Sequence, residues 1–135
     1  MKSVLCLVVL VVLSSAAVLA QEKDANYQGL MQANSATLGT LRKSLEAKSG
    51  DAVAADAKKL EEIFGQVRAF WEARNAADAV KFATDAEAGF KQVGELAAAG
   101  KLDEAGDALK ATQANCGGCH TAHRERGADG EWMIK

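Results

Sequence analysis

The chain has 135 residues, and its 18 acidic and 16 basic side chains leave a net charge of −2 at neutral pH. No basic stripe interleaved with aromatic residues runs along it, so the sequence argues against nucleic acid as a partner. Proline is absent and alanine is frequent, and both properties favour uninterrupted helices.

Residues 1–20 have the pattern of a secretory signal peptide. Lys2 supplies the positive start, an apolar run extends from Val4 to Leu13, and small residues lead to a cleavage point after Ala20. The run is too short for a comfortable transmembrane helix. We therefore expect an exported, soluble periplasmic protein that keeps no membrane anchor after signal cleavage. The remaining residues, 21–135, suit a single domain with one core.

The first helix is predicted from about Asp24 to Lys48. Its seam is a set of residues that recur at alternating steps of four and three, which is typical of a helix in a bundle. These residues are Tyr27, Met31, Asn34, Leu38, Leu41 and Leu45. Asn34 is polar, and we expect it either to face a polar group inside the fold or to lie at the margin. Ser49–Gly50 is predicted to end the helix, and Asp51 to cap the next one.

Two further helices, from about Ala52 to Arg74 and from about Ala77 to Ala99, repeat this spacing. The seam of the earlier helix contains Val53, Ala57, Leu60, Phe64, Val67 and Trp71. The seam of the later helix contains Ala79, Ala83, Ala86, Phe90, Val93 and Ala97. Asn75 is predicted to close the earlier helix, and Gly100 the later one.

A fourth helix is predicted with Asp103 as its cap. Its stripe contains Ala105, Leu109, Thr112, Cys116, Cys119 and His123. Four amphipathic helices joined by short loops predict an all-α fold, an antiparallel up-down-up-down four-helix bundle. The tail from Ala128 to Lys135 receives no structural prediction.

The sequence Cys116-Gly-Gly-Cys-His120, called the haem motif below, is the attachment signature of a c-type haem. The two thiols add across the two vinyl groups of the porphyrin, and the imidazole then reaches the iron from one side. On a helix the three side chains stand at i, i+3 and i+4 and share one face. Gly117 and Gly118 carry no side chain that could collide with the ring. Cys6 leaves with the signal peptide, so both remaining cysteines belong to the motif.

Three other interpretations of the motif stay open. A zinc site would need a fourth ligand and usually a second closely spaced pair. A thioredoxin-like redox pair is expected beside a βαβ pattern, and a structural disulfide would not need His120. The haem interpretation accounts for all three residues. It also explains the many alanines of the seams, because a flat apolar ring would fill the space that they leave.

A haem motif near the C-terminus of a four-helix chain resembles the class II c-type cytochromes, the cytochrome c′ superfamily. The resemblance covers nearly all of residues 21–135. The segments that carry it are the haem motif, Arg124 four residues after it, Phe70 to Glu72 with Phe82 following, and Tyr27 to Met31. It implies one haem c, bound covalently through Cys116 and Cys119.

The resemblance also implies roles for matching residues. His120 is expected to be the proximal axial ligand, with Arg124 near the proximal side of the haem. Trp71 is expected to pack against the ring or its immediate neighbours. Met31 matches the position that faces the other side of the iron. Tyr27 departs from the arginine that many members carry there, which leaves the partner of a haem propionate open.

Plainer interpretations of these residues stay open as well. Met31 is either the second axial ligand or a side chain that fills the distal pocket. Trp71 is either a haem contact or an ordinary core anchor. Arg124 is either a haem neighbour or a surface charge at the end of a helix.

These features predict a periplasmic electron carrier that exchanges electrons with redox partner proteins through Fe(II)/Fe(III) cycling. The alternative is a five-coordinate protein that binds nitric oxide or carbon monoxide, and Met31 separates the two. Enzyme activity is not expected, because the first helix offers no histidine as a distal acid–base group. The resemblance further implies a homodimer formed through the first two helices.

Overall fold

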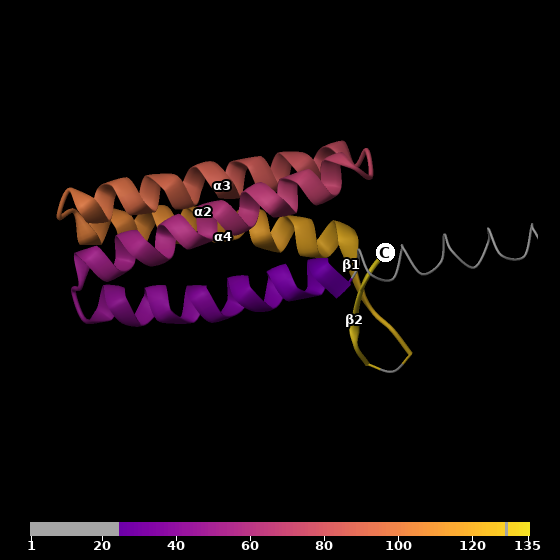
Figure 1. The fold of residues 1–135 in the computed structure, drawn as a ribbon, viewed down its shortest axis with the longest axis horizontal. Coiled ribbons are helices and arrows are strands. Elements are labelled where there is room, and N and C mark those ends of the chain that lie inside the picture. The colour runs from indigo at the N-terminus through magenta and orange to yellow at the C-terminus, as the bar shows by residue number, and fades with distance from the viewer. Residues whose placement is uncertain (1–24, 129) are drawn as a thin grey trace, which may run out of the picture.

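A computed structural model describes residues 25–128 and 130–135. Within this part of the chain, four helices form a bundle in which each helix runs opposite to the one before it (Figure 1). The first helix is described over residues 25–46. It is followed by α2 (Gly50–Glu72), α3 (Ala77–Ala98) and α4 (Leu102–His123). The predicted four-helix bundle is confirmed, and the predicted signal peptide lies outside the described residues.

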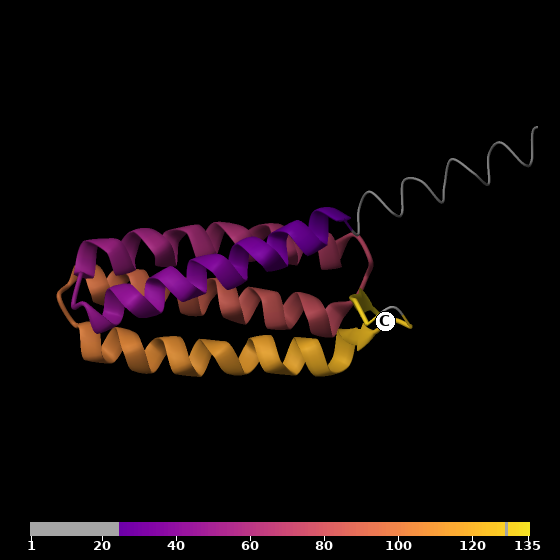
Figure 2. The ribbon, with the colours of Figure 1, turned by 90° about the horizontal axis from the view of Figure 1, so that it is seen from below.

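The predicted seams form the core of the bundle. Every seam residue of α2 and α3 is buried, because a stripe at four–three spacing faces the neighbouring helices along its whole length. The five largest fully buried side chains are Leu41, Val53, Leu60, Phe90 and Val93. All five come from the halves of the helices that adjoin the loops 47–49 and 99–101 (Figure 2). The bundle is therefore packed most tightly at that end.

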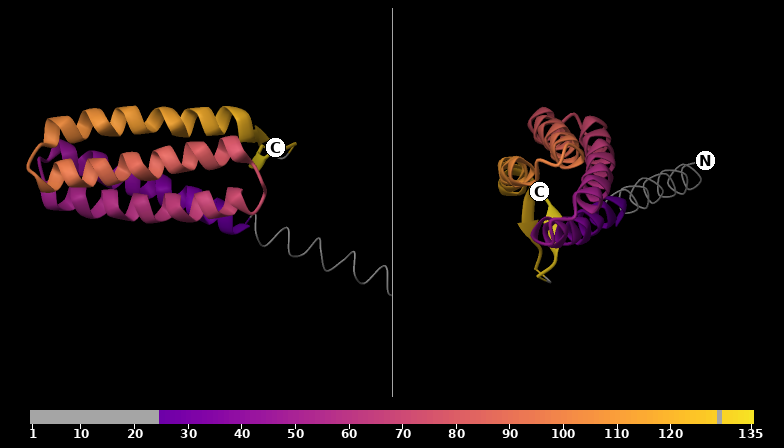
Figure 3. Two further views of the ribbon diagram at one scale, coloured as in Figure 1. Left: turned by 90° about the horizontal axis from the view of Figure 1, so that it is seen from above. Right: turned by 90° about the vertical axis from the view of Figure 1, so that its left-hand side faces the viewer.

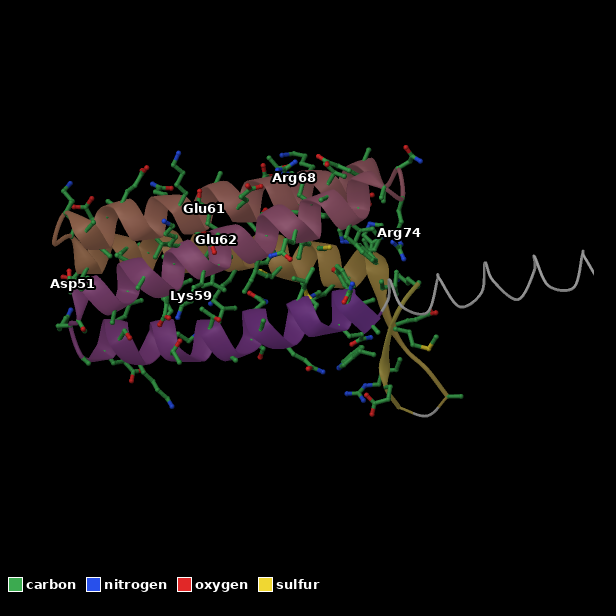
Figure 4. The ribbon with its side chains drawn as sticks, viewed as in Figure 1. Asp51, Lys59, Glu61, Glu62, Arg68 and Arg74 are labelled. Atoms are coloured by element: carbon green, nitrogen blue, oxygen red, sulfur yellow. The ribbon has the colours of Figure 1, made fainter. Side chains whose placement is uncertain are left out.

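The outward face of α2 carries charged side chains, several of which point away from the bundle (Figure 4). Arg68 pairs with Glu72 at 2.8 Å and with Glu87 of α3 at 2.9 Å. Partly exposed pairs of this kind contribute little to stability. This face is a solvated surface that leaves the apolar stripe of α2 to hold the helix in place.

The helix ends differ from prediction. Ser49 is the N-cap of α2 and makes no side-chain capping hydrogen bond, so Asp51 lies in the first turn instead of capping the helix. Lys48, with φ of 55°, adopts the left-handed conformation just before Ser49–Gly50, where the first helix was predicted to end. Gly50 already belongs to α2, where a Cβ would lie 3.2 Å from the carbonyl oxygen of Ala97. This close approach to the end of α3 leaves little room for a side chain at position 50.

The start of α4 is a second correction. Lys101 is its N-cap, and Asp103 lies in the first turn, where a negative charge is favourable. The carboxylate of Asp103 accepts a hydrogen bond from Lys48 Nζ at 2.8 Å. The predicted stops after the second and third helices are confirmed, since Asn75 and Gly100 both have positive φ, at 55° and 75°.

After α4 the chain forms a small antiparallel hairpin that was not predicted. Its strands are β1 (Arg124–Arg126) and β2 (Trp132–Ile134), with Arg124 opposite Ile134 and Arg126 opposite Trp132. The hairpin lies at the end of the bundle away from the tightly packed core (Figure 1). No helix among the described residues combines the length and the apolar character that a membrane span requires.

Candidate functional site

The buried stripe of α4 becomes half-exposed where the haem motif begins. Ala105, Leu109 and Thr112 are buried, whereas Cys116 and Cys119 are half-buried. At this level the first helix, α4 and the hairpin enclose a cavity of about 580 Å³, called the main cavity below. Its volume is within the range of cavities that hold small molecules and cofactors.

The three reactive side chains of the haem motif all line the main cavity. The helical spacing predicted for Cys116, Cys119 and His120 is confirmed, because α4 runs without interruption to His123. The same three side chains also line a smaller pocket of about 20 Å³, together with Phe64 of α2 and Phe82 of α3. The motif therefore faces the interior of the bundle.

Burial changes the acidity of the motif side chains. Burial raises the pKa of the Cys116 thiol, and burial together with the neighbouring Cys116 raises the pKa of Cys119 to about 11. Both groups are free thiols, and at neutral pH they are protonated. The reactive cysteine of a thioredoxin-like pair has a lowered pKa. The environment of these thiols therefore argues against the redox-pair interpretation.

His120 is half-buried in the same environment. Burial, and then the positive charge of Arg124, lowers the pKa of His120 below its ordinary value. The imidazole is consequently neutral at neutral pH, which is the form that binds a metal ion. Among residues 25–128 and 130–135 no group of three or more His, Cys, Asp and Glu side chains is arranged to hold a bare metal ion.

The first helix supplies the facing wall of the main cavity. Met31 is half-buried there and lines both the main cavity and the smaller pocket. Asn34, one turn later, is 7% exposed, and its side-chain carbonyl oxygen has no hydrogen-bond partner. It is the sole buried side-chain N or O atom in that state within the described residues. Asn34 lies inside the fold, as the first of its two expectations had it, but its side-chain oxygen meets no polar group there.

Trp71 lies behind this wall and does not line the main cavity. Its indole N–H donates a hydrogen bond to the hydroxyl of Tyr27 at 3.2 Å, and its ring lies 4.8 Å from that of His123. Tyr27 and His123 both line the cavity. Burial raises the pKa of Tyr27 to about 12, so its hydroxyl stays protonated at neutral pH. Trp71 is thus in contact with two cavity-lining residues.

Two residues at the end of α4 connect the site to its surroundings. His123 Nε2 lies 2.9 Å from a carboxylate oxygen of Asp78 at the start of α3, and this hydrogen bond lowers the pKa of Asp78. Arg124 begins β1 and lines the cavity, with its guanidinium carbon 3.9 Å from the centre of the Trp132 ring. Neither Asp78 nor Trp132 was singled out from the sequence, because only the fold brings them to α4.

The two glycines of the motif have different surroundings. A Cβ on Gly118 would lie 2.6 Å from the ring of Phe82, whereas a Cβ on Gly117 would meet no protein atom within 4 Å. Gly118 is therefore required for the close approach of α3 to α4. Both glycines were predicted to leave room for a bound ring. Gly118 is needed, in addition, for the packing of Phe82 within the protein itself.

Comparisons with family models, with curated proteins and with solved structures found no match for this chain.

Proposed function

We propose that this chain is an exported c-type cytochrome that carries electrons with one haem c held in the main cavity. The observation that carries the proposal is that Cys116, Cys119 and His120 project from one face of α4 into a single cavity, with Met31 on its facing wall. Two thiols and one neutral imidazole on a continuous helix are the groups that covalent haem attachment needs. Export to the periplasm is part of the proposal and is supported by the signal-peptide pattern of residues 1–20.

The residues present fit a haem. Cys116 and Cys119 would hold it covalently, His120 would bind the iron, and Met31 is the candidate for the second axial position. The cavity is large, and the unsatisfied oxygen of Asn34 marks a place where the haem-free chain lacks a partner. When bound, a haem with these ligands supplies one-electron Fe(II)/Fe(III) chemistry.

The chain's own contribution is to hold the ligands in place. His120 lies on a helix that is packed against α3, and Met31 lies on a helix whose neighbouring seam residues Tyr27 and Asn34 are buried. Side chains fixed in this way keep the same positions in both oxidation states. An electron carrier requires that its ligand side chains move little when the iron is oxidised.

A second candidate function is the binding of nitric oxide or carbon monoxide at a five-coordinate iron. The observation in its favour is Asn34, whose buried amide faces the cavity beside Met31 and could hydrogen-bond a small ligand. This function requires Met31 to be absent from the iron or readily displaced. The two functions therefore differ in the role of one thioether.

The haem proposal is tested by producing the full chain with a haem-maturation system and measuring its intact mass and visible spectrum. We expect the mass of residues 21–135 plus one haem, and a c-type absorption spectrum. The double variant Cys116→Ser/Cys119→Ser should lose the covalent haem, whereas Gln113→Ala, which removes a cavity-lining side chain of α4 without a thiol, should keep it. A colourless wild-type protein with the mass of the bare polypeptide would contradict the proposal.

The role of Met31 is tested on the loaded protein. In the electron carrier, the ferric form should show a methionine–iron charge-transfer band that disappears in Met31→Ala. The matched control is Leu38→Ala, which shortens another cavity-lining side chain of the same helix and should keep the band. A high-spin ferric wild type that takes up carbon monoxide rapidly after reduction would favour the gas-binding function instead.

A further inference from the structure

The C-terminal hairpin bridges the mouth of the main cavity. Side chains alternate along its strands, so Arg124 and Arg126 share one face with Trp132 and Ile134. Ile134 packs against the core, and the amide of Gln28 on the first helix donates a hydrogen bond to the carbonyl oxygen of Trp132 at 2.6 Å. The hairpin therefore connects the end of α4 to the first helix across the open end of the bundle (Figure 3).

Trp132 lies between the cavity and the solvent. It lines the main cavity and yet is 40% exposed, and the adjacent Met133 is 49% exposed. Within the described residues these two are the exposed large hydrophobic side chains. Tryptophan, methionine and arginine are enriched where proteins bind one another. The hairpin thus has the composition of a contact surface and adjoins the proposed haem.

This surface also carries two arginines that form no ion pair with any residue the structure describes. The guanidinium carbons of Arg124 and Arg126 lie 3.9 and 4.3 Å from the centre of the Trp132 ring, and Arg126 donates a hydrogen bond to the carbonyl oxygen of Gly130. Neither forms an ion pair with a described residue. Six cations on and between the helices pair with carboxylates, namely Lys48, Lys59, Arg68, Lys81, Lys101 and Lys110. Lys43, Lys58 and Lys91 form no ion pair with a described residue.

Of the three acidic residues of the hairpin, Glu125, Asp129 and Glu131, the structure describes Glu125 and Glu131. Glu125 lies opposite Met133 in the register and so points to the other face of the strands. Glu131 lines the cavity and has an interaction partner of its own. On the described strands, the face that carries Trp132 therefore holds two guanidinium groups and no carboxylate.

We propose that Arg124, Arg126 and Trp132, the hairpin surface, are where this protein exchanges electrons with a redox protein whose own centre is surrounded by carboxylates. The inference rests on the proposed function. One electron passes from the reduced partner to the ferric iron, so the partner is oxidised and the iron reduced, and no bond forms or breaks. Carboxylates on the partner would meet the two guanidinium groups and orient its approach.

The test uses the haem-loaded, reduced protein and two small oxidants of opposite charge, ferricyanide and tris(phenanthroline)cobalt(III), in stopped-flow experiments at low ionic strength. Arg126→Gln should slow oxidation by ferricyanide by about threefold or more and should not slow oxidation by the cobalt complex. Lys110→Gln, which removes the same charge from an exposed site on α4, should leave both rates near wild type. Added salt should reduce the difference between the variants.

A second variant covers the case in which Arg126→Gln disturbs the hairpin. Met133→Glu adds a negative charge at an exposed position and leaves the arginines on Trp132 in place, and it should also slow ferricyanide. Equal ferricyanide rates in wild type, Met133→Glu and Lys110→Gln would overturn the inference. A protein that carries no haem would instead refute the proposed function, so the two failures are distinguishable.

Discussion

The contribution of Asn34 to the stability of the protein depends on what occupies the main cavity. A buried carbonyl oxygen without a partner costs about 1–3 kcal/mol relative to one that is satisfied. Its position in the seam of the first helix would suit a leucine, as at Leu38 and Leu41, if packing alone determined the residue. The polar residue is consistent with a role in the haem-loaded protein that we propose.

We predict that Asn34→Leu stabilises the haem-free chain by about 1–2 kcal/mol, because it removes the unsatisfied oxygen and adds apolar burial. Denaturant unfolding of the Cys116→Ser/Cys119→Ser chain, with and without Asn34→Leu, measures the difference. Gln32→Leu is the matched control, since it makes the same kind of change at an exposed position of the same cavity wall and should alter stability by less than about 0.5 kcal/mol. A loss of stability in Asn34→Leu would mean that the amide is already satisfied.

At the scale of elements, α3 and α4 meet through the haem motif itself. Gly118 lets the ring of Phe82 lie against the backbone of α4. At Gly117, the preceding residue, an added Cβ would meet no protein atom within 4 Å. Adding a methyl group at the two positions therefore has opposite consequences. At Gly117 only the gain in helix propensity applies, and at Gly118 the added group collides with an aromatic ring.

In the haem-free chain, Gly117→Ala is predicted to raise the free energy of unfolding by about 0.5–1 kcal/mol, because alanine is the better helix former. Gly118→Ala is predicted to lower it by about 1–2 kcal/mol, since overpacking costs more than the gain in propensity. Thermal or denaturant unfolding of the two variants side by side gives the comparison, each serving as the control for the other. If both substitutions stabilised the chain equally, the Phe82 contact would not limit α3–α4 packing.

The elements that could be predicted from sequence are those with a periodic pattern. The seams of α2 and α3 repeat over six positions each, and every one of those positions is buried. The predicted caps Asp51 and Asp103 were wrong, because α2 begins at Gly50 and α4 at Leu102, so both aspartates lie in a first helical turn. The strands of the hairpin have three residues each, which is too short for an alternation to stand out from the surrounding sequence.

The candidate site was predictable to the extent that its residues are neighbours in sequence. The haem motif is local, so its helical placement followed from spacing alone. Asp78 and His123 are 45 positions apart, and Gln28 and Trp132 are 104 apart, and no local pattern links either pair. The roles of Met31, Trp71 and Arg124 at a haem stay predictions that the loaded protein has to test.

At the scale of the whole molecule, the bundle has a complete core at one end and an incomplete one at the other. The five largest fully buried side chains lie toward the loops 47–49 and 99–101, while the main cavity occupies the opposite end between the first helix and α4. The size of the seam residues of α3 differs between the two ends of the bundle. Phe90 and Val93 lie in the half with the complete core, and Ala79, Ala83 and Ala86 lie in the other half. Of these three alanines, Ala83 lines the smaller pocket beside the haem motif.

This asymmetry predicts that the haem-free chain opens from the cavity end. In the Cys116→Ser/Cys119→Ser chain, amide hydrogens of residues 114–123 should exchange faster than those of 53–60 and 90–97, because fewer buried contacts hold the last turns of α4. Haem attachment in the wild type should raise protection mainly over residues 114–123 and around Met31, since a group bound only by the folded state stabilises what it touches. Hydrogen exchange followed by mass spectrometry resolves these segments. Even protection along the haem-free chain would mean that the cavity end is stable by itself, and the argument from an incomplete core would fail.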